Sequence, residues 1–301
     1  MTTQAKPSLV AAIEAGGTKF VCALGRGPDE LVAETRIPTT SPAATLGSAI
    51  DFFKAAEGQH GEKIAALGVA TFGPADVNPA SPSFGFITTT PKAGWARTRV
   101  LGALRDAFPV PAGFDTDVNG AALGEWRWGA GAGKNSVLYL TVGTGIGGGL
   151  CIGGHSLHGL THPEMGHVLV SRPAAERAIF GGVCPFHGDC LEGIASGPAL
   201  AARWGCPADS LPDDHAAWDL EVDYLASALC QFIFVASPEI IILGGGVGGR
   251  SHLLSPLRER VAARINGYVP LPAVVPPGLG SRSGLLGALA LGLAALKRGT
   301  M

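Results

Sequence analysis

Hydrophobic residues along this chain follow two patterns, short buried runs typical of strands and longer stretches with helical spacing. Residues 9–24 form a strand-like run, a glycine-rich turn and a second strand-like run, and residues 137–152 repeat that plan. Because alternating strands and helices follow each copy, the repeat predicts two similar α/β lobes. The other predicted elements are helices at 41–56, 95–108, 118–128, 220–237 and 284–296, and strands at 64–70, 110–114 and 239–243.

Two of the predicted helices carry further signals. Ser41 is a suitable N-cap, and Pro42 fits the first helical position, where its missing N–H removes no helical hydrogen bond. Residues 284–296 form the longest apolar run, about 13 residues, whereas a membrane span needs roughly 18. We therefore expect a buried helix that contains glycines, and no membrane partner.

The composition favours a small-molecule partner. The chain has 301 residues, enough for two domains, with a formal net charge of -2 and 15% charged residues. It has no basic block, which argues against nucleic-acid binding. Its six cysteines are scattered, and Cys22 and Cys151 lie in strand-like runs, so they form no disulfide framework. No basic and apolar leader precedes the first strand, and we expect a cytoplasmic protein.

The 45 glycines gather where predicted strands end. One turn lies at residues 16–19 and includes Thr18 and Lys19, and another lies at residues 143–149 and includes Thr144. The second turn has the spacing of a dinucleotide-binding motif, but it opens a strand where that motif requires a helix, and no Walker-type phosphate loop is present. Backbone N–H groups in such turns form anion-binding nests, so the two turns predict a polyphosphate site. Ordinary tight hairpins are the alternative.

Asp117 stands between the strand predicted at 110–114 and the helix predicted at 118–128. Ligands of α/β proteins bind at strand ends, and phosphoryl transfer uses a carboxylate to accept the proton of the attacking hydroxyl. A helix N-terminus also favours the ionised form of a carboxylate. Asp117 is thus a candidate general base, although its position equally suits an N-cap.

A short segment carries four potential metal ligands, namely His167, Cys184, His187 and Cys190. The last three have C-x2-H-x2-C spacing, and four such nitrogen and sulfur donors are the tetrahedral set that Zn²⁺ prefers. A site whose four positions are all protein ligands is structural, so the metal would hold a loop that presents Glu164 and Glu192. The alternatives are cysteines buried as apolar residues, or a disulfide in a secreted protein.

The chain carries a series of motifs, in order Glu14-Ala-Gly-Gly-Thr-Lys19, Thr116-Asp-Val-Asn-Gly-Ala-Ala-Leu-Gly-Glu125, Leu140-Thr-Val-Gly-Thr-Gly-Ile-Gly-Gly-Gly149, Glu164-Met-Gly-His167, the cysteine segment and Leu243-Gly-Gly-Gly246. Together these motifs resemble the ROK family of sugar kinases over essentially the whole chain. The first motif, His162-Pro-Glu-Met-Gly-His167 and the cysteine segment look like the fructokinase branch.

The resemblance implies an α/β, actin-like ATPase fold, in which duplicated RNase H-like lobes close over ATP-Mg²⁺ and a hexose, with a zinc-bound loop. It implies a small lobe at residues 1–116, a large lobe at 117–283, and a C-terminal helix at about 284–298 that packs back on the small lobe. The implied reaction converts D-fructose to fructose 6-phosphate, and the implied assembly is a homodimer.

The resemblance also implies roles for single residues, with Asp117 as the general base. ATP would bind at Gly16, Gly17, Thr18, Lys19, Thr144, Gly145, Gly245 and Gly246. The sugar would bind at Thr116, Asp117, Glu164, His167 and Glu192. Three departures stand out: Glu14 replaces the usual Asp near Mg²⁺, Thr116 replaces an Asn that contacts the sugar, and the metal ligands become two His and two Cys instead of one His and three Cys.

Other activities stay open at this point. A glucokinase, a mannokinase or an amino-sugar kinase of the family would share these motifs. A sugar-responsive regulator needs an N-terminal helix-turn-helix, and the first strand, from about Val10, leaves no room for one. A zinc hydrolase is disfavoured because four protein ligands leave no position for water. His155, His158 and His162 suit surface or capping roles, although His162 adjoins Glu164.

Overall fold

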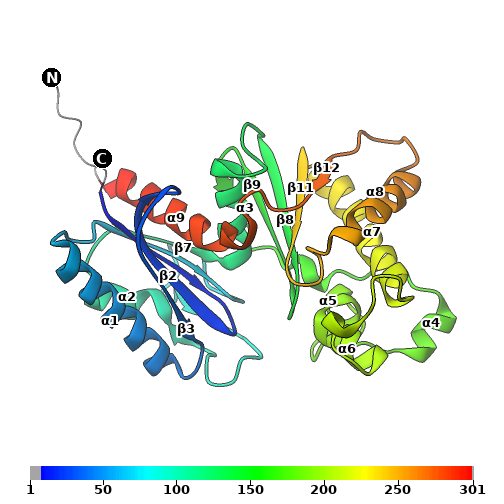
Figure 1. The fold of residues 1–301 in the computed structure, drawn as a ribbon, viewed down its shortest axis with the longest axis horizontal. Coiled ribbons are helices and arrows are strands. Elements are labelled where there is room, and N and C mark those ends of the chain that lie inside the picture. The colour runs from blue at the N-terminus through cyan, green and yellow to red at the C-terminus, as the bar shows by residue number, and fades with distance from the viewer. Residues whose placement is uncertain (1–7, 300–301) are drawn as a thin grey trace.

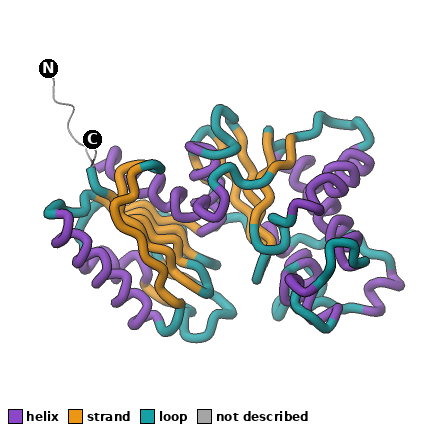
Figure 2. Tube along the Cα trace, in the orientation of Figure 1, coloured by secondary structure: helices purple, strands orange, loops and turns teal. Residues whose placement is uncertain are grey.

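The computed structural model describes residues 8–299, so residues 1–7 of the predicted small lobe lie outside the described residues. Two five-stranded sheets lie apart from each other, with helices packed on their faces (Figure 1). Helices α3 (Asp117–Trp128) and α9 (Ser283–Gly299) run between the sheets and pack on each other (Figure 2). Among the described residues, none of the helices is both long and apolar enough to cross a membrane.

The first sheet has the strand order β3-β2-β1-β4-β7. Its strands are β1 (Val10–Ala15), β2 (Lys19–Gly27), β3 (Glu30–Pro38), β4 (Ala66–Thr71) and β7 (Ala112–Thr116). The first three form an antiparallel meander, and β4 and β7 extend the sheet in parallel. Helices α1 (Pro42–His60) and α2 (Val100–Ala107) lie on one face, and α9 (Ser283–Gly299) lies on the other.

The second sheet repeats this arrangement in the order β10-β9-β8-β11-β12. Its strands are β8 (Ser136–Val142), β9 (Ile146–Ile152), β10 (His155–Ser156), β11 (Ile240–Gly244) and β12 (Ala273–Val275). Again three strands are antiparallel and two are parallel. Helices α7 (Ala217–Ala236) and α8 (Ser251–Ile265) lie on one side, and α3 (Asp117–Trp128) lies on the other. The shared order confirms the predicted duplication.

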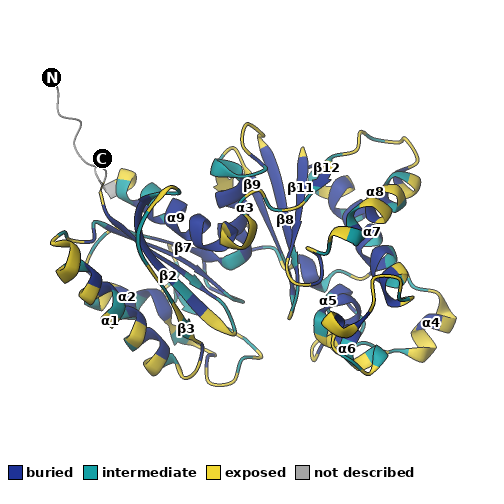
Figure 3. Cartoon of the chain, viewed as in Figure 1, coloured by how far each residue is buried: buried dark blue, intermediate teal, exposed yellow. Residues whose placement is uncertain are grey.

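Smaller elements complete the two lobes. A two-stranded sheet joins β5 (Phe86–Ile87) to β6 (Thr98–Arg99). The short helices are α4 (Ala174–Ile179), α5 (Leu191–Ala195) and α6 (Gly197–Trp204), with 3-10 turns at Met165–His167, Ala208–Ser210 and Gly280–Arg282. Burial is greatest in the two sheets and in the helices between them, whereas α1 and α4 expose their outer faces (Figure 3).

Glycines allow α3 and α9 to pack closely between the sheets. A Cβ atom added to Gly287 of α9 would lie 1.8 Å from the carbonyl oxygen of Gly120 on α3. On the other side of α9, a Cβ on Gly68 of β4 would lie 1.8 Å from the carbonyl oxygen of Ala288. These distances are far below any real contact, so the predicted glycine-bearing helix is explained by the close approach of its backbone to two neighbours.

The predicted helix at 95–108 is wrong at its start, because α2 begins at Val100. Trp95 is fully buried, and its indole N–H donates a hydrogen bond to the Thr40 carbonyl at 2.8 Å. Arg97 has a φ of 59°, a left-handed conformation that no α-helix contains. Tertiary burial of Trp95 thus outweighs the helical spacing of this stretch.

Other boundaries shift by a few residues. Ser41 is the N-cap of α1, as predicted, and accepts a hydrogen bond from the Ala44 N–H at 3.4 Å. The helix ends at His60, four residues past the predicted 41–56. Strand β7 lies two residues later than predicted, and α7 begins three residues earlier. These differences leave the order of elements unchanged.

Candidate active site and metal centre

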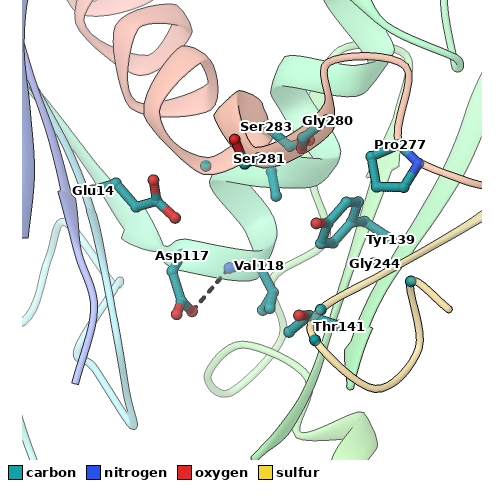
Figure 4. Close-up of a pocket in the computed structure, with 15 residues that line it drawn as sticks. Glu14, Asp117, Val118, Tyr139, Thr141, Gly244, Pro277, Gly280, Ser281 and Ser283 are labelled. Atoms are coloured by element: carbon teal, nitrogen blue, oxygen red, sulfur yellow. Dashed lines mark hydrogen bonds between the residues drawn. The ribbon is translucent and has the colours of Figure 1, made fainter. Parts of the chain in front are cut away.

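A cavity of about 450 Å³ lies where α3 and α9 begin, between the two sheets. Its lining includes Glu14 of β1, Asp117 of α3, Tyr139 and Thr141 of β8, the glycines Gly244, Gly245 and Gly246 after β11, and Pro277, Gly280, Ser281, Ser283 and Gly284. Figure 4 shows Glu14 and Asp117 on one side of the cavity, with Tyr139 and Pro277 on the other. Carboxylates from the first sheet and from α3 thus meet in one pocket.

Asp117 is the first residue of α3 and not its N-cap. The N-cap is Thr116, whose side-chain hydroxyl accepts a hydrogen bond from the Asn119 N–H at 3.2 Å. Asp117 Oδ1 accepts the N–H of its neighbour Val118 at 2.9 Å (Figure 4). The interpretation of Asp117 as only an N-cap is therefore wrong, because Thr116 already has that role.

The environment of Asp117 disfavours its charge. Burial raises the pKa of Asp117 to about 7, and the negative charges of Glu14 and Glu164 add to this effect. The hydrogen bond from the Val118 N–H opposes it. Burial also raises the pKa of Glu14, against the positive charge of Lys19. Two neighbouring carboxylates with raised pKa values are a natural place for a cation, because a cation stabilises both in their ionised forms.

The turn between β1 and β2 carries the first predicted phosphate site. The Gly16 N–H donates to the Lys19 carbonyl at 3.0 Å, and a Cβ on Gly16 would lie only 2.9 Å from that oxygen. Thr39 braces the turn, since its hydroxyl donates to the Gly16 carbonyl at 2.7 Å and its N–H donates to the Thr18 carbonyl at 2.9 Å. Thr18 and Lys19 are exposed. The turn is thus held from behind while its side chains face solvent.

Two further glycine turns of the second lobe lie close together. A Cβ on Gly143 would lie 3.7 Å from the Gly246 nitrogen. Gly245 has a φ of 90°, and a Cβ there would lie 2.2 Å from the Val142 carbonyl oxygen, so only glycine fits. Of the predicted phosphate and adenosine residues, Gly245 and Gly246 line the cavity. Gly16, Gly17, Thr18, Lys19, Thr144 and Gly145 are outside that lining.

Glu164 and Glu192, two of the predicted sugar ligands, have different partners. Glu164 lies between two histidines, with Oε1 3.5 Å from His162 Nδ1 and Oε2 3.9 Å from His167 Nε2. Glu192 Oε2 accepts the Ile146 N–H at 2.9 Å, next to the second glycine turn. The hydroxyl of Thr116, a third predicted ligand, caps α3 instead of standing free. The lining of the cavity includes none of the predicted sugar ligands Thr116, Glu164, His167 and Glu192.

The four predicted metal ligands come together, with their donor atoms all within 4.8 Å of one another. We call His167, Cys184, His187 and Cys190 the Cys/His cluster. The two histidine Nδ1 atoms are 3.3 Å apart, and three of the four distances from Nδ1 to Sγ lie between 3.4 Å and 3.8 Å. A tetrahedral Zn²⁺ with bonds of about 2.0–2.3 Å has edges of about 3.3–3.8 Å, so the spacing fits Zn²⁺. Both cysteines are free thiols, which contradicts the disulfide alternative.

Sequence reasoning missed several polar contacts around the site. His162 is 5% exposed, so a surface role is wrong, and its Nε2 accepts the Ala75 N–H at 3.1 Å. His158 lies 3.0 Å from Asp115, which raises the pKa of His158. Glu125 is fully buried. The only sequence signal for His162 is its position beside Glu164, and the other two give none.

The duplicated lobes and the cavity between them define an actin-like ATPase fold. The family model described as ROK family matches residues 10–295, and this chain belongs to that family. A fructokinase of Zymomonas mobilis is 43% identical, covering 94% of this chain and 96% of the relative. A fructokinase of Pediococcus pentosaceus is 41% identical, with 96% and 99% covered. The crystal structure of a ROK hexokinase from Thermus thermophilus aligns with a TM-score of 0.80 and 28% identity over 97% of this chain and all of that one.

Proposed function

We propose that this protein is an ATP-dependent fructokinase, which transfers the γ-phosphoryl group of ATP to the 6-hydroxyl of D-fructose. The observation that carries this proposal is the half-buried carboxylate of Asp117 at the cavity, whose pKa of about 7 suits a proton acceptor near neutral pH. The two relatives named fructokinase support fructose as the hexose.

In the proposed reaction Asp117 accepts the proton of the attacking hydroxyl. Its Oδ1 is oriented by the Val118 N–H, which leaves Oδ2 for that proton. The α3 N-terminus stabilises the ionised carboxylate. The phosphates bind at the turns of Gly16, Gly17, Thr18 and Lys19 and of Thr144 and Gly145, and the adenosine binds at Gly245 and Gly246.

The acidic side of the cavity suits Mg²⁺. When bound with ATP, Mg²⁺ neutralises charge on the β- and γ-phosphates. Glu14 fits its coordination shell, directly or through water, because Mg²⁺ binds to proteins through one or two carboxylates. Glu14 lies on the same side of the cavity as Asp117 (Figure 4). The longer side chain of Glu replaces the Asp that the family resemblance implies.

We propose a structural Zn²⁺ at the Cys/His cluster. The donor distances support a tetrahedral ion, which when bound holds the loop that carries His167. His167 contributes Nδ1 to the cluster, so its Nε2 faces Glu164 and is available to a sugar hydroxyl. Glu164, His167 and Glu192, together with Thr116, bind the sugar in this proposal.

The lobes proposed to close over the substrates are residues 1–116 and 117–283, with α9 packed against the first. The repeated strand order supports this division, and so do the contacts of α9 with β1, β4 and β7. A net charge of -2 supports small-molecule substrates over nucleic acid. The homodimer and the cytoplasmic location stay predictions.

A coupled ADP-release assay with ATP-Mg²⁺ and a panel of hexoses tests the proposal. We expect the fastest ADP release with fructose, and phosphorus NMR should show a 6-phosphate. Glucose, mannose and amino sugars in the same panel test the other kinases of the family. A folded, zinc-loaded protein that releases no ADP with any hexose would refute the proposed function.

A further inference from the structure

Glu125, near the end of α3, is fully buried, and its carboxylate accepts four hydrogen bonds. Oε1 accepts the Leu279 N–H at 2.9 Å and the Ser283 hydroxyl at 2.7 Å. Oε2 accepts the Ala130 N–H at 2.8 Å and the Gly278 N–H at 3.0 Å. Three of the four partners are backbone N–H groups, which can only donate, so each carboxylate oxygen accepts at least one hydrogen bond from the backbone.

The backbone around this carboxylate is built to approach it. A Cβ on Gly129 would lie 2.0 Å from Glu125 Oε2, and a Cβ on Gly278 would lie 2.5 Å from the Ala130 nitrogen. Both positions must therefore be glycine for the chain to enclose the carboxylate. A buried carboxylate is strongly unfavourable unless hydrogen bonds compensate for its lost hydration. Three of its four hydrogen-bond donors come from residues 278–283, which lie more than 150 positions after Glu125 along the chain.

The segment that Glu125 holds is a wall of the cavity. Pro277, Gly280, Ser281 and Ser283 line it (Figure 4). The same segment leads into α9, whose second residue, Gly284, lies against Glu14, since a Cβ there would be 2.4 Å from Glu14 Oε1. At the other end of α3, Asp117 begins the helix. Glu125 thus ties the wall, and through it the first turn of α9, to the helix that carries the candidate base.

We propose that Glu125 is a positioning residue of the nucleotide site, which holds residues 278–283 against α3 so that the cavity wall is formed before ATP binds. The inference rests on the proposed function, because it takes this cavity as the place of the nucleotide. Glu125 has no direct contact with the cavity, and it acts through the segment that it holds. A preformed wall lowers the free energy spent on ordering the segment when the nucleotide binds.

The substitution Glu125→Gln tests this idea with little change in shape. It replaces one acceptor oxygen by an NH2 group. At the Oε2 position this group would face the N–H groups of Ala130 and Gly278, and at the Oε1 position it would face the Leu279 N–H. In either orientation at least one backbone N–H loses its acceptor, so we expect the wall to shift.

The experiment compares full-length wild type with Glu125→Gln, Ser283→Ala and Phe53→Leu. It measures KM for ATP and for fructose, the Kd of ADP by calorimetry, and Tm. We expect Glu125→Gln to raise the KM for ATP and the Kd of ADP about tenfold, with the KM for fructose within about twofold. Ser283→Ala removes one donor without stranding an N–H, so we expect a rise of about threefold. Phe53, a fully buried residue of α1 outside the cavity, controls for lost stability: its variant should lower Tm alone.

An unchanged KM for ATP and an unchanged Kd of ADP in Glu125→Gln, with a Tm lowered as in Phe53→Leu, would overturn the inference. An equal rise of both KM values would overturn it too. If Glu125→Gln does not fold, Ser283→Ala decides, and an unchanged Kd of ADP counts against the role. If the wild type phosphorylates no hexose, the proposed function fails, and the ADP affinities still decide the role of Glu125.

Discussion

The raised pKa of Asp117 suits a proton acceptor, but it also lowers the stability of the folded protein. Its folded-state pKa of about 7 lies well above the ordinary value of 3.8. Between these two values the folded protein keeps a proton that the unfolded chain has lost, so stability falls as the pH rises through this range. Above pH 7 the carboxylate is ionised in both the folded and the unfolded state, and the full loss in free energy of unfolding remains. A residue kept in such a position is typical of functional sites.

Replacing Asp117 by Asn separates these two effects. We expect kcat to fall by at least about 10²-fold, the lower range of general-base effects, because the amide accepts no proton at neutral pH. We also expect the Tm difference between variant and wild type to be more favourable at pH 8 than at pH 5. Steady-state kinetics and thermal melts at the two pH values measure both. Near-normal kcat in a folded variant would refute the role as base.

His162 is expected to orient Glu164. Because the Ala75 N–H donates to Nε2, the proton of the neutral ring lies on Nδ1, which faces the Pro163 carbonyl at 3.3 Å and Glu164 Oε1 at 3.5 Å. His162→Gln keeps an acceptor for Ala75 and loses that donor. We expect the KM for fructose to rise about fivefold and the KM for ATP to stay constant. The exposed His155 supplies the control His155→Gln, and equal fructose KM values in the two variants would contradict the prediction.

Whether the sequence predicts a contact between two residues depends on how far apart they lie along the chain. The ligands of the Cys/His cluster have a local spacing, and Asp117 begins a helix, so both could be predicted from short patterns. The contact of His162 with Ala75 joins residues 87 positions apart, and that of Glu125 with Gly278 joins residues 153 apart. Partners this distant are set by the fold, and no local pattern identifies them.

At the scale of elements, contacts other than the proposed Zn²⁺ hold the loop that carries the Cys/His cluster. Next to the cluster, Asp189 Oδ2 is 3.2 Å from Arg172 Nη1 and 2.8 Å from Arg177 Nε, and the Arg172 side chain is fully buried. Arg172 also donates to the Phe180 carbonyl at 2.6 Å. These contacts would keep part of the loop in place without the proposed Zn²⁺. Metal loss should therefore disturb the positions of His167 and Glu164 more than the fold of the lobe.

We expect one Zn²⁺ per chain, found by elemental analysis of the purified protein. Cys184→Ser should lose that metal and raise the KM for fructose, whereas the KM for ATP should change little, because the cavity proposed to bind the nucleotide includes no residue of the cluster. Cys206, which lies outside the cluster, provides the matched control Cys206→Ser. No tightly bound zinc in wild type, or an unchanged fructose KM in Cys184→Ser, would argue against a structural metal.

The close contact between α3 and α9 leads to a second prediction, which concerns stability. Gly287→Ala would place a Cβ 1.8 Å from the Gly120 carbonyl oxygen, so the two helices must separate. We expect the free energy of unfolding to fall by about 1–3 kcal/mol, as for overpacked or strained cores. Gly58→Ala in α1 is the control, because nothing lies within 4 Å of its added Cβ, and it should stabilise by about 0.5–1 kcal/mol. Urea unfolding of both variants measures the difference, and equal stabilities would contradict the close packing.

Hydrophobic periodicity predicts which helices exist better than it predicts where they begin and end. Residues 95–99 have apolar positions that fit a helix, yet Trp95 is turned into the core by its bond to Thr40. The N-cap of α1 was predictable, because Ser41 and the following proline act within four residues. Local sequence thus predicts helix N-caps, whereas side chains that pack against other elements determine where other helix boundaries fall.

For the whole molecule, the repeated strand-turn-strand segments predicted both lobes. The two sheets have the same order, with β1 and β8 in equivalent central positions. The family resemblance already assigned α3, which follows a strand of the first sheet, to the second lobe, but the sequence did not reveal that α3 packs on α9. That crossing, made possible by glycines on both helices, places Asp117 at the start of α3 between the lobes.

The choice of sugar is expected to depend on this whole assembly. Glu164 is contacted by His162, which reaches the first lobe through Ala75, while Glu192 is tied to a glycine turn and His167 to the Cys/His cluster. Sites that hydrogen-bond particular hydroxyls reject analogues that misplace them, by factors up to about 10⁴–10⁵, because buried polar groups are left unpaired.

We therefore expect fructose to give the highest kcat/KM, with glucose and mannose measurable but poorer, since these hexoses share the 6-hydroxyl and differ around carbons 1 and 2. Partial removal of zinc should flatten this ranking before activity is lost, because His167 would no longer be held rigidly beside Glu164. The hexose panel, run on zinc-loaded and partly depleted protein, measures both effects. If glucose or an amino sugar exceeded fructose about tenfold in kcat/KM, about 1.4 kcal/mol of transition-state preference, the fructose assignment would fail while the kinase assignment would stand.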